Sequence, residues 1–152
     1  SKCVQVGVDG LIIVDLQPEE DADLYLKTKK SNIDLIRLIT PTTNKERLKT
    51  ILNNASGFLY YVTVTGITGQ NSANLKELET SINLIRSESN LPIVAGFGIK
   101  SRKDVENIST FTDGVVVGSS IVNIIKDNIS NKKSMLEKID SFTKDLKRGT
   151  IS

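Results

Sequence analysis

Three glycine-bearing turns are the first places where this sequence could bind a ligand. They are "TGITG" at 65–69, "IVAGFGIKS" at 93–101 and "VVVGSSIV" at 115–122. Main-chain N–H groups exposed by glycine can approach an anion closely, and a helix beginning at Ser119 would add its own positive end. Phosphate oxygens suit such donors without any lysine or arginine. Any one of these turns taken alone could be a plain tight loop, because glycine is common wherever a chain turns.

Other kinds of chemistry are excluded by what the sequence lacks. It has no histidine and a single cysteine, Cys3. Ser-His-Asp and Cys-His nucleophile systems and His-ligated metal sites are therefore excluded within the chain, and we expect no metal. Acid–base work would fall to carboxylates, lysines or tyrosines. The "GFG" spacing is not the GxGxxG fingerprint and no acidic residue follows at the required distance, which argues against dinucleotide binding.

Length and composition indicate one ordinary globular domain over residues 1–152, with 38% hydrophobic and 25% charged residues. A net charge of +2, with spread lysines, gives no electrostatic case for nucleic acid. No apolar run approaches the roughly 20 residues of a membrane helix. The lone cysteine cannot form an internal disulfide, and no secretory signal pattern opens the chain, so we expect a cytoplasmic protein.

Apolar runs rich in Ile and Val alternate with segments of helical period, as in repeated βαβ units. The predicted strands are 10–14, 33–39, 58–63, 92–96 and 114–118. The predicted helices are 18–30, 44–55, 73–88, 101–109, 119–127 and 132–148. Pro18 suits a first helical turn, and Asn44 and Ser101 suit N-caps.

The predicted fold class is α/β with parallel (βα) units, either an open sheet or part of a (β/α)8 barrel. Five strands are too few to close an eight-stranded barrel. "SKCVQVG" at 1–7 resembles the end of a helix that feeds the first strand, which suggests a part upstream. We expect the tail 149–152 to fray. In both architectures ligands bind at the carboxyl ends of the strands, where all three glycine turns lie.

Four blocks of this sequence resemble the tryptophan synthase alpha chain, in that family's order and at its spacing. The blocks are "GVDGLIIVDLQPEE" (7–20), "FLYYVTVTGITG" (58–69), "PIVAGFGIKSRKDV" (92–105) and "DGVVVGSSIVNII" (113–125). The resemblance covers essentially the whole chain and corresponds to the carboxyl-terminal part of the family, strands 4–8 of its TIM barrel. The fold it implies is an incomplete TIM (β/α)8 barrel with five strands present.

The resemblance implies a lyase of tryptophan biosynthesis that cleaves indole-3-glycerol phosphate into indole and glyceraldehyde 3-phosphate by a retro-aldol step. A carboxylic acid protonates indole C3, a carboxylate takes the indole N–H and glycerol hydroxyl protons, and the C–C bond breaks. The family's alpha chain carries no cofactor. It docks on a PLP-dependent beta chain in an alpha2-beta2 complex, and that beta chain consumes the indole.

The resemblance also assigns roles to single residues. The phosphate cradle would be Gly69, Gly98, Gly118 and Ser119; the indole pocket would be Ile12, Phe97 and Val116; the supporting catalytic residues would be Tyr60 and Thr68. Without the resemblance, the aromatic residues would be ordinary core or loop residues. Ile12 and Val116 would be plain barrel packing, and Thr68 a loop hydroxyl.

The loop after the first strand would face the beta chain, so Asp15, Gln17 and Pro18 are predicted partner contacts. Val14 and Gln17 stand where the family usually has prolines. The family's two catalytic carboxylates match no residue of this sequence, and we expect them upstream. We therefore predict that these 152 residues alone are inactive. The alternative is a non-catalytic half-barrel that binds phosphate or docks on a beta-type partner.

Overall fold

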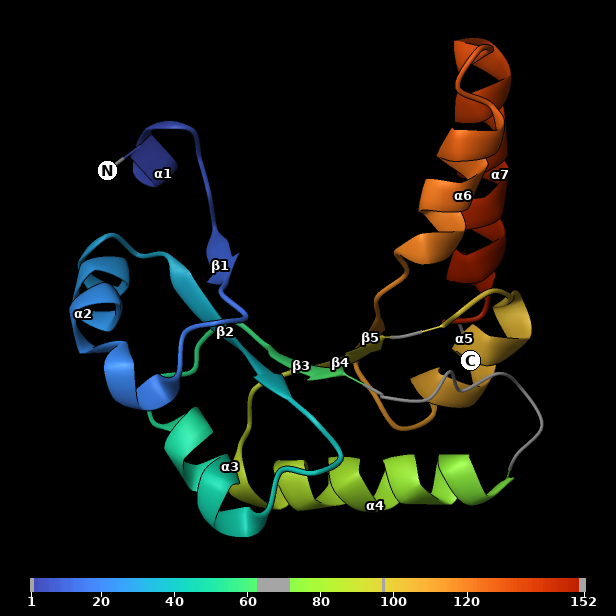
Figure 1. The fold of residues 1–152 in the computed structure, drawn as a ribbon. Coiled ribbons are helices and arrows are strands. Elements are labelled where there is room, and N and C mark those ends of the chain that lie inside the picture. The colour runs from blue at the N-terminus through green and yellow to red at the C-terminus, as the bar shows by residue number, and fades with distance from the viewer. Residues whose placement is uncertain (1, 63–71, 97, 151–152) are drawn as a thin grey trace.

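The protein is a five-stranded, wholly parallel sheet flanked by helices, and a computed structural model describes residues 2–62, 72–96 and 98–150 (Figure 1). The strand order is β1-β2-β3-β4-β5, so neighbours in sequence are neighbours in the sheet. The strands are β1 (Gly10–Ile12), β2 (Asp34–Ile39), β3 (Leu59–Val62), β4 (Ile93–Gly96) and β5 (Gly114–Val115). The predicted α/β class with parallel units is confirmed.

Helices follow the strands at the predicted places. They are α1 (Lys2–Gln5), the 3-10 helix η1 (Pro18–Glu20), α2 (Ala22–Lys30), α3 (Lys45–Leu52), α4 (Ser72–Glu88), α5 (Arg102–Ser109), α6 (Ser119–Asp127) and α7 (Lys132–Arg148). The predicted N-caps are confirmed: the Asn44 side chain accepts from the Arg47 N–H, and Ser101 forms a capping box with Asp104. None of these helices has both the length and the apolar composition needed to cross a bilayer.

Several elements differ from their predicted bounds: the strand predicted over 10–14 ends at Ile12, and the helix predicted over 44–55 ends at Leu52. Two further differences involve contacts elsewhere in the fold. The single helix predicted over 18–30 is split, because Asp21 leaves the helical conformation and forms a buried ion pair with Arg37. The predicted strand 114–118 has ladder pairing only at Gly114 and Val115, although the Val116 N–H still donates to the Ala95 carbonyl at 2.9 Å.

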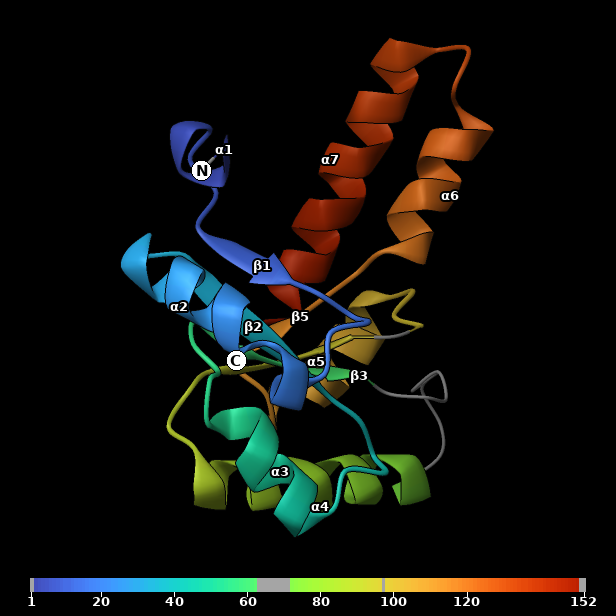
Figure 2. The same cartoon turned by 60° about the vertical axis from the view of Figure 1, so that its left-hand side comes forward.

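One face of the sheet forms the core of the protein. Side chains alternate between faces along a strand, and in β3 the buried Leu59 and Tyr61 alternate with the half-buried Tyr60 and Val62. Helices α3, α4 and α5 cover the buried face (Figures 1 and 2). Core residues at 2% exposure or less are Leu35, Ile39, Leu48, Leu59, Tyr61, Leu78, Ile82, Ile85, Ile93, Ala95, Ile99, Val105 and Ile108.

The opposite face of the sheet is open among the described residues. Ile12 is 44% exposed, and Tyr60, Val62 and Val94 are only half-buried. In the described residues β1 pairs only with β2, and β5 pairs only with β4, so each end of the sheet has a free edge. An apolar inner face with two free edges is what an incomplete barrel leaves uncovered.

The two ends of the chain are both helical in the described residues. The short α1 confirms the helix expected before the first strand. The tail was expected to fray from Gly149, but Gly149 is buried and its N–H donates to the Leu146 carbonyl at 2.9 Å. A Cβ at Gly149 would stand 2.8 Å from the Arg102 carbonyl oxygen, so this glycine packs closely against α5. Residues 151–152 lie outside the described range.

Candidate active site

Tyr60, Gly96 and Val116 meet at the carboxyl ends of three neighbouring strands. A Cβ placed on Gly96 would stand 2.8 Å from the Tyr60 hydroxyl oxygen, 2.7 Å from the Val116 carbonyl oxygen and 2.8 Å from the Val116 Cβ. Since real Cβ atoms do not approach other atoms this closely, Gly96 is what lets the two neighbours come together. The Tyr60 hydroxyl and the Val116 side chain thus lie at one place on the open face.

The Tyr60 hydroxyl is a neutral group at physiological pH. Burial raises the pKa of Tyr60 above its ordinary value because the phenolate would lose solvation. The hydroxyl can therefore donate one hydrogen bond and accept another, but it does not act as an anionic base. Such a group can orient a substrate hydroxyl or a carboxylate.

The turn after β4 has a conformation that favours glycine. Gly98 has a φ of 73°, in the left-handed region where a side chain is strained. Two and three residues after Gly98, the main-chain N–H groups of Lys100 and Ser101 both donate to Asp104 Oδ2 at 3.0 Å. Asp104 is only 5% exposed, so its carboxylate holds this turn from inside the protein.

The turn after β5 begins helix α6. Gly118 is the N-cap residue, and a Cβ there would meet nothing within 4 Å. Ser119 is exposed at the first position of the helix. Ser120, the next residue, donates from its Oγ to the Ile99 carbonyl at 2.7 Å. That bond joins the turn after β4 to the start of α6, so two of the three predicted glycine turns lie side by side.

The structure describes only some of the other residues that were predicted to form the site. Thr68, Gly69 and Phe97 lie outside the described residues. Ile12 and Val116 belong to the two opposite edges of the sheet, with three strands between them, and no described contact joins their side chains. Tyr60, Gly98, Gly118 and Ser119 all lie at the rim formed by the carboxyl ends of β3, β4 and β5.

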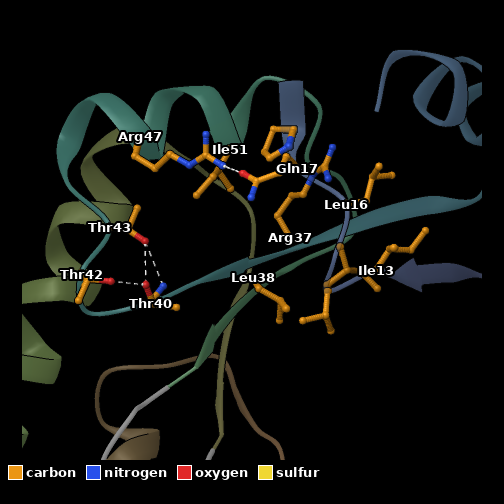
Figure 3. Close-up of a pocket in the computed structure, with 13 residues that line it drawn as sticks. Ile13, Leu16, Gln17, Arg37, Leu38, Thr40, Thr42, Thr43, Arg47 and Ile51 are labelled. Carbon is orange, nitrogen blue, oxygen red and sulfur yellow. Dashed lines mark hydrogen bonds between the residues drawn. The ribbon is translucent and has the colours of Figure 1, made fainter. Parts of the chain in front are cut away.

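A hollow lies at the ends of β1 and β2, as Figure 3 shows. It has a volume of about 320 Å³ and is lined by the predicted contact residues Gln17 and Pro18, but not by the exposed Asp15. Arg47 of α3 donates from Nη2 to Gln17 Oε1 at 2.7 Å and forms an ion pair with Glu19. One arginine thus fixes the loop after β1 at two points.

The base of that loop is held by a buried cluster that pattern reasoning missed. Arg37 and Asp21 form an ion pair at 5% and 1% residue exposure, and Asn54 Nδ2 donates to Asp21 Oδ1 at 3.0 Å. Burial lowers the pKa of Arg37. The sequence offered one signal for this cluster: Arg37 stands inside the apolar run "IDLIRLI". An arginine buried in a strand needs a charged or polar partner.

Metal-ligating side chains are not clustered in the part of the chain that the structure describes. Within residues 2–62, 72–96 and 98–150, no three His, Cys, Asp or Glu side chains are grouped so that they could hold a metal ion. The described residues at the rim offer hydrogen bonding from main-chain amides, one phenol and serine hydroxyls.

Comparison with known proteins gives one consistent family. The family model described as "Tryptophan synthase alpha chain" matches residues 1–151. The tryptophan synthase alpha chain of Zymomonas mobilis is 41% identical over 142 residues, 93% of this chain and 52% of that protein. The alpha chain of Petrotoga mobilis is 40% identical over 147 residues and is covered over 57% of its length.

A solved structure agrees with this family. The tryptophan synthase subunit alpha from Campylobacter jejuni superposes with a TM-score of 0.82 at 38% identity, over 93% of this chain and 56% of that one. The five-stranded sheet is thus an incomplete (β/α)8 barrel. The chain spans about half the length of the curated relatives it matches, at 52% and 57%.

Proposed function

The chain belongs to the tryptophan synthase alpha chain family, and from that premise we propose that it forms the phosphate-binding half of the site that cleaves indole-3-glycerol phosphate. The products are indole and glyceraldehyde 3-phosphate, in tryptophan biosynthesis. The observation that carries the proposal is the bond between Ser120 and Ile99, which brings the turns after β4 and β5 to one place on the rim.

The phosphate would be bound mainly by main-chain amides. Gly98 has a left-handed conformation that disfavours a side chain, and Gly118 has open space around its Cβ position. Ser119 begins helix α6, whose first amides have no acceptor within the helix. Gly69 would complete the cradle from the turn after β3. Oxyanions are bound well by such fixed donors because no side chain must be ordered first.

The reacting part of the substrate would lie inward of the phosphate, on the open face of the sheet. There the Tyr60 hydroxyl would orient the glycerol hydroxyl or a catalytic carboxylate, and Thr68 would hold the catalytic aspartate. Val116 would form one wall of the indole pocket, with Phe97 and Ile12 as further walls. The half-buried, apolar character of this face supports an indole ring as its occupant.

The acid and base would come from residues outside the printed sequence. In the reaction, a carboxylic acid protonates indole C3 while a carboxylate takes the indole N–H and glycerol hydroxyl protons, and the C–C bond breaks. A general acid or base must lie within about 3 Å of its proton. We therefore propose that these 152 residues alone do not cleave the substrate.

The partner would be a tryptophan synthase beta chain, which holds the PLP and consumes the indole. A solved structure similar to this chain is that of "the tryptophan synthase a2b2 complex from a hyperthermophile, Pyrococcus furiosus", at 27% identity and a TM-score of 0.81. Asp15, Gln17 and Pro18 would contact that partner, beside the hollow at the ends of β1 and β2. A cytoplasmic location remains a prediction.

The test compares two proteins: the intact gene product and the isolated 152-residue segment. Indole release from indole-3-glycerol phosphate is measured for each, with and without the beta chain. We expect activity from the intact product and none from the segment. Phosphate binding without any activity in the intact product would favour the non-catalytic half-barrel instead. Normal indole release by the segment would refute the assignment of the acid and base.

A further inference from the structure

Ser120 makes a side-chain contact outside its own helix. It occupies the second position of α6, yet its Oγ donates to the Ile99 carbonyl, 21 residues earlier in the chain, at 2.7 Å. Ile99 is 2% exposed, so its carbonyl has little access to water as an alternative partner. The hydroxyl therefore links the helix after β5 to the turn after β4.

The same turn is fixed on its other side by its own helix. The Lys100 and Ser101 N–H groups donate to the buried Asp104 of α5 at 3.0 Å, and the Ser101 hydroxyl bonds the same Asp104 oxygen at 2.9 Å. These bonds orient the turn relative to α5 but not relative to α6. Among the described side-chain hydrogen bonds, the Ser120 bond is the one that joins the turn to α6.

We infer that Ser120 is a positioning residue that sets the separation between the Gly98 turn and the first amides of α6. The inference rests on the proposed function, because it concerns how those two groups of donors bind one phosphate. Donors within about 2.7–3.0 Å of several oxygens of one anion must be held at a fixed spacing. If the two turns moved independently, binding would have to order them, which weakens affinity.

The experiment measures binding of two probes, inorganic phosphate and glycerol 3-phosphate, to the intact gene product by calorimetry. Ser120→Ala removes the bond, and Ser120→Thr retains a hydroxyl at the same atom. Ser87→Ala is the matched control, because Ser87 Oγ also donates to a main-chain carbonyl, that of Leu84, at 2.7 Å, but within α4. Indole, which has no phosphate, serves as the control ligand, and thermal melting checks folding.

We expect Ser120→Ala to weaken binding of both phosphate probes by about 3- to 10-fold, as the loss of one hydrogen bond implies. Ser120→Thr should restore most of the affinity, and Ser87→Ala should leave it unchanged. Indole binding should be the same in all variants.

Two results would overturn the inference alone: unchanged phosphate binding by Ser120→Ala, or an equal loss of phosphate and indole binding. Failure of Ser120→Thr to recover affinity while it melts like the wild type would also overturn it. If the unmodified protein binds neither phosphate probe, the proposed function itself fails, and that outcome is distinct from the other three.

Discussion

The hydroxyl oxygen of Tyr60 lies 2.8 Å from the position that a Cβ on Gly96 would occupy. The two residues sit on adjacent parallel strands, where Val62 is the register partner of Gly96 and Tyr60 lies two residues earlier on the same face. The tyrosine therefore leans over the glycine toward the strand ends. The absence of one side chain at position 96 places the phenol at the rim.

Gly96→Ala should disturb this arrangement directly. The added methyl would meet the Val116 carbonyl oxygen at 2.7 Å, which is main chain and cannot simply rotate away. We expect a loss of about 1–3 kcal/mol in the free energy of unfolding, measured by urea denaturation, as for other overpacked sites. Gly118→Ala is the stability control, because nothing lies within 4 Å of its Cβ position. Equal stability of the two variants would contradict the packing described here.

Tyr60→Phe should lower indole release by the intact gene product about 10-fold or more, because a neutral donor near the reacting groups is lost. Its melting temperature should change little, since the hydroxyl faces the open side of the sheet. Tyr61→Phe is the matched control: Tyr61 is 2% exposed on the opposite, buried face of the same strand. Its turnover should stay normal. Equal turnover by Tyr60→Phe and the unmodified enzyme would remove Tyr60 from the site.

Arg47→Met should weaken binding of the beta chain about 2- to 5-fold, as expected for loss of a partly exposed ion pair and hydrogen bond. Arg47 holds Gln17 and Glu19 in the loop proposed to face that partner. Arg86→Met removes a comparable surface ion pair, that with Asp113, at another place and should not alter binding. Titration calorimetry with the beta chain checks both variants, and equal affinities would show that the loop needs no such support.

Asp113 should contribute stability that depends on pH. Partial burial acts to raise the pKa of the Asp113 carboxyl. The hydrogen bonds from the Ile93 N–H at 2.8 Å and from Arg86 at 3.0 Å outweigh this effect and lower that pKa below its ordinary value of 3.8. A lowered pKa means that the contribution is complete above the ordinary value and is lost as pH falls through the folded-state value.

Asp113→Asn should therefore be less stable than the unmodified protein at about pH 6, by about 1 kcal/mol or less because the pair is partly exposed. The difference should shrink as the pH falls below the ordinary pKa value of 3.8, because the unfolded chain and then the folded carboxylate bind a proton. Urea unfolding midpoints above and below that value test this. A difference that stays constant, or grows with acid, would contradict the assigned sign.

Local patterns predicted the parts of the fold that local physics decides. Ser101 as N-cap and the bounds of α6 and α7 follow from capping chemistry and helical period, and the structure confirms them. The predicted bounds were wrong for the helix over 18–30, where a residue distant in sequence determines the local conformation. Asp21 breaks the helix predicted over 18–30 because it pairs with Arg37, sixteen positions away in sequence and buried.

The candidate site shows the same division. Glycines at strand ends could be identified from sequence alone, since a parallel sheet brings its carboxyl ends to one rim. The Ser120–Ile99 and Arg47–Gln17 bonds join segments 21 and 30 residues apart, and no spacing rule indicates them. The roles proposed for Tyr60 and Gly98 come from the resemblance to a family, because pattern alone would leave these residues as a core aromatic and a turn.

The decisive experiment is a crystal structure of the intact gene product with bound glycerol 3-phosphate. We expect phosphate oxygens within about 3 Å of the main-chain nitrogens of Gly98 and of the first turn of α6. We also expect the Tyr60 hydroxyl to face the glycerol end of the ligand. A phosphate bound away from these two turns, or turns that point apart around it, would show that they do not form one phosphate site.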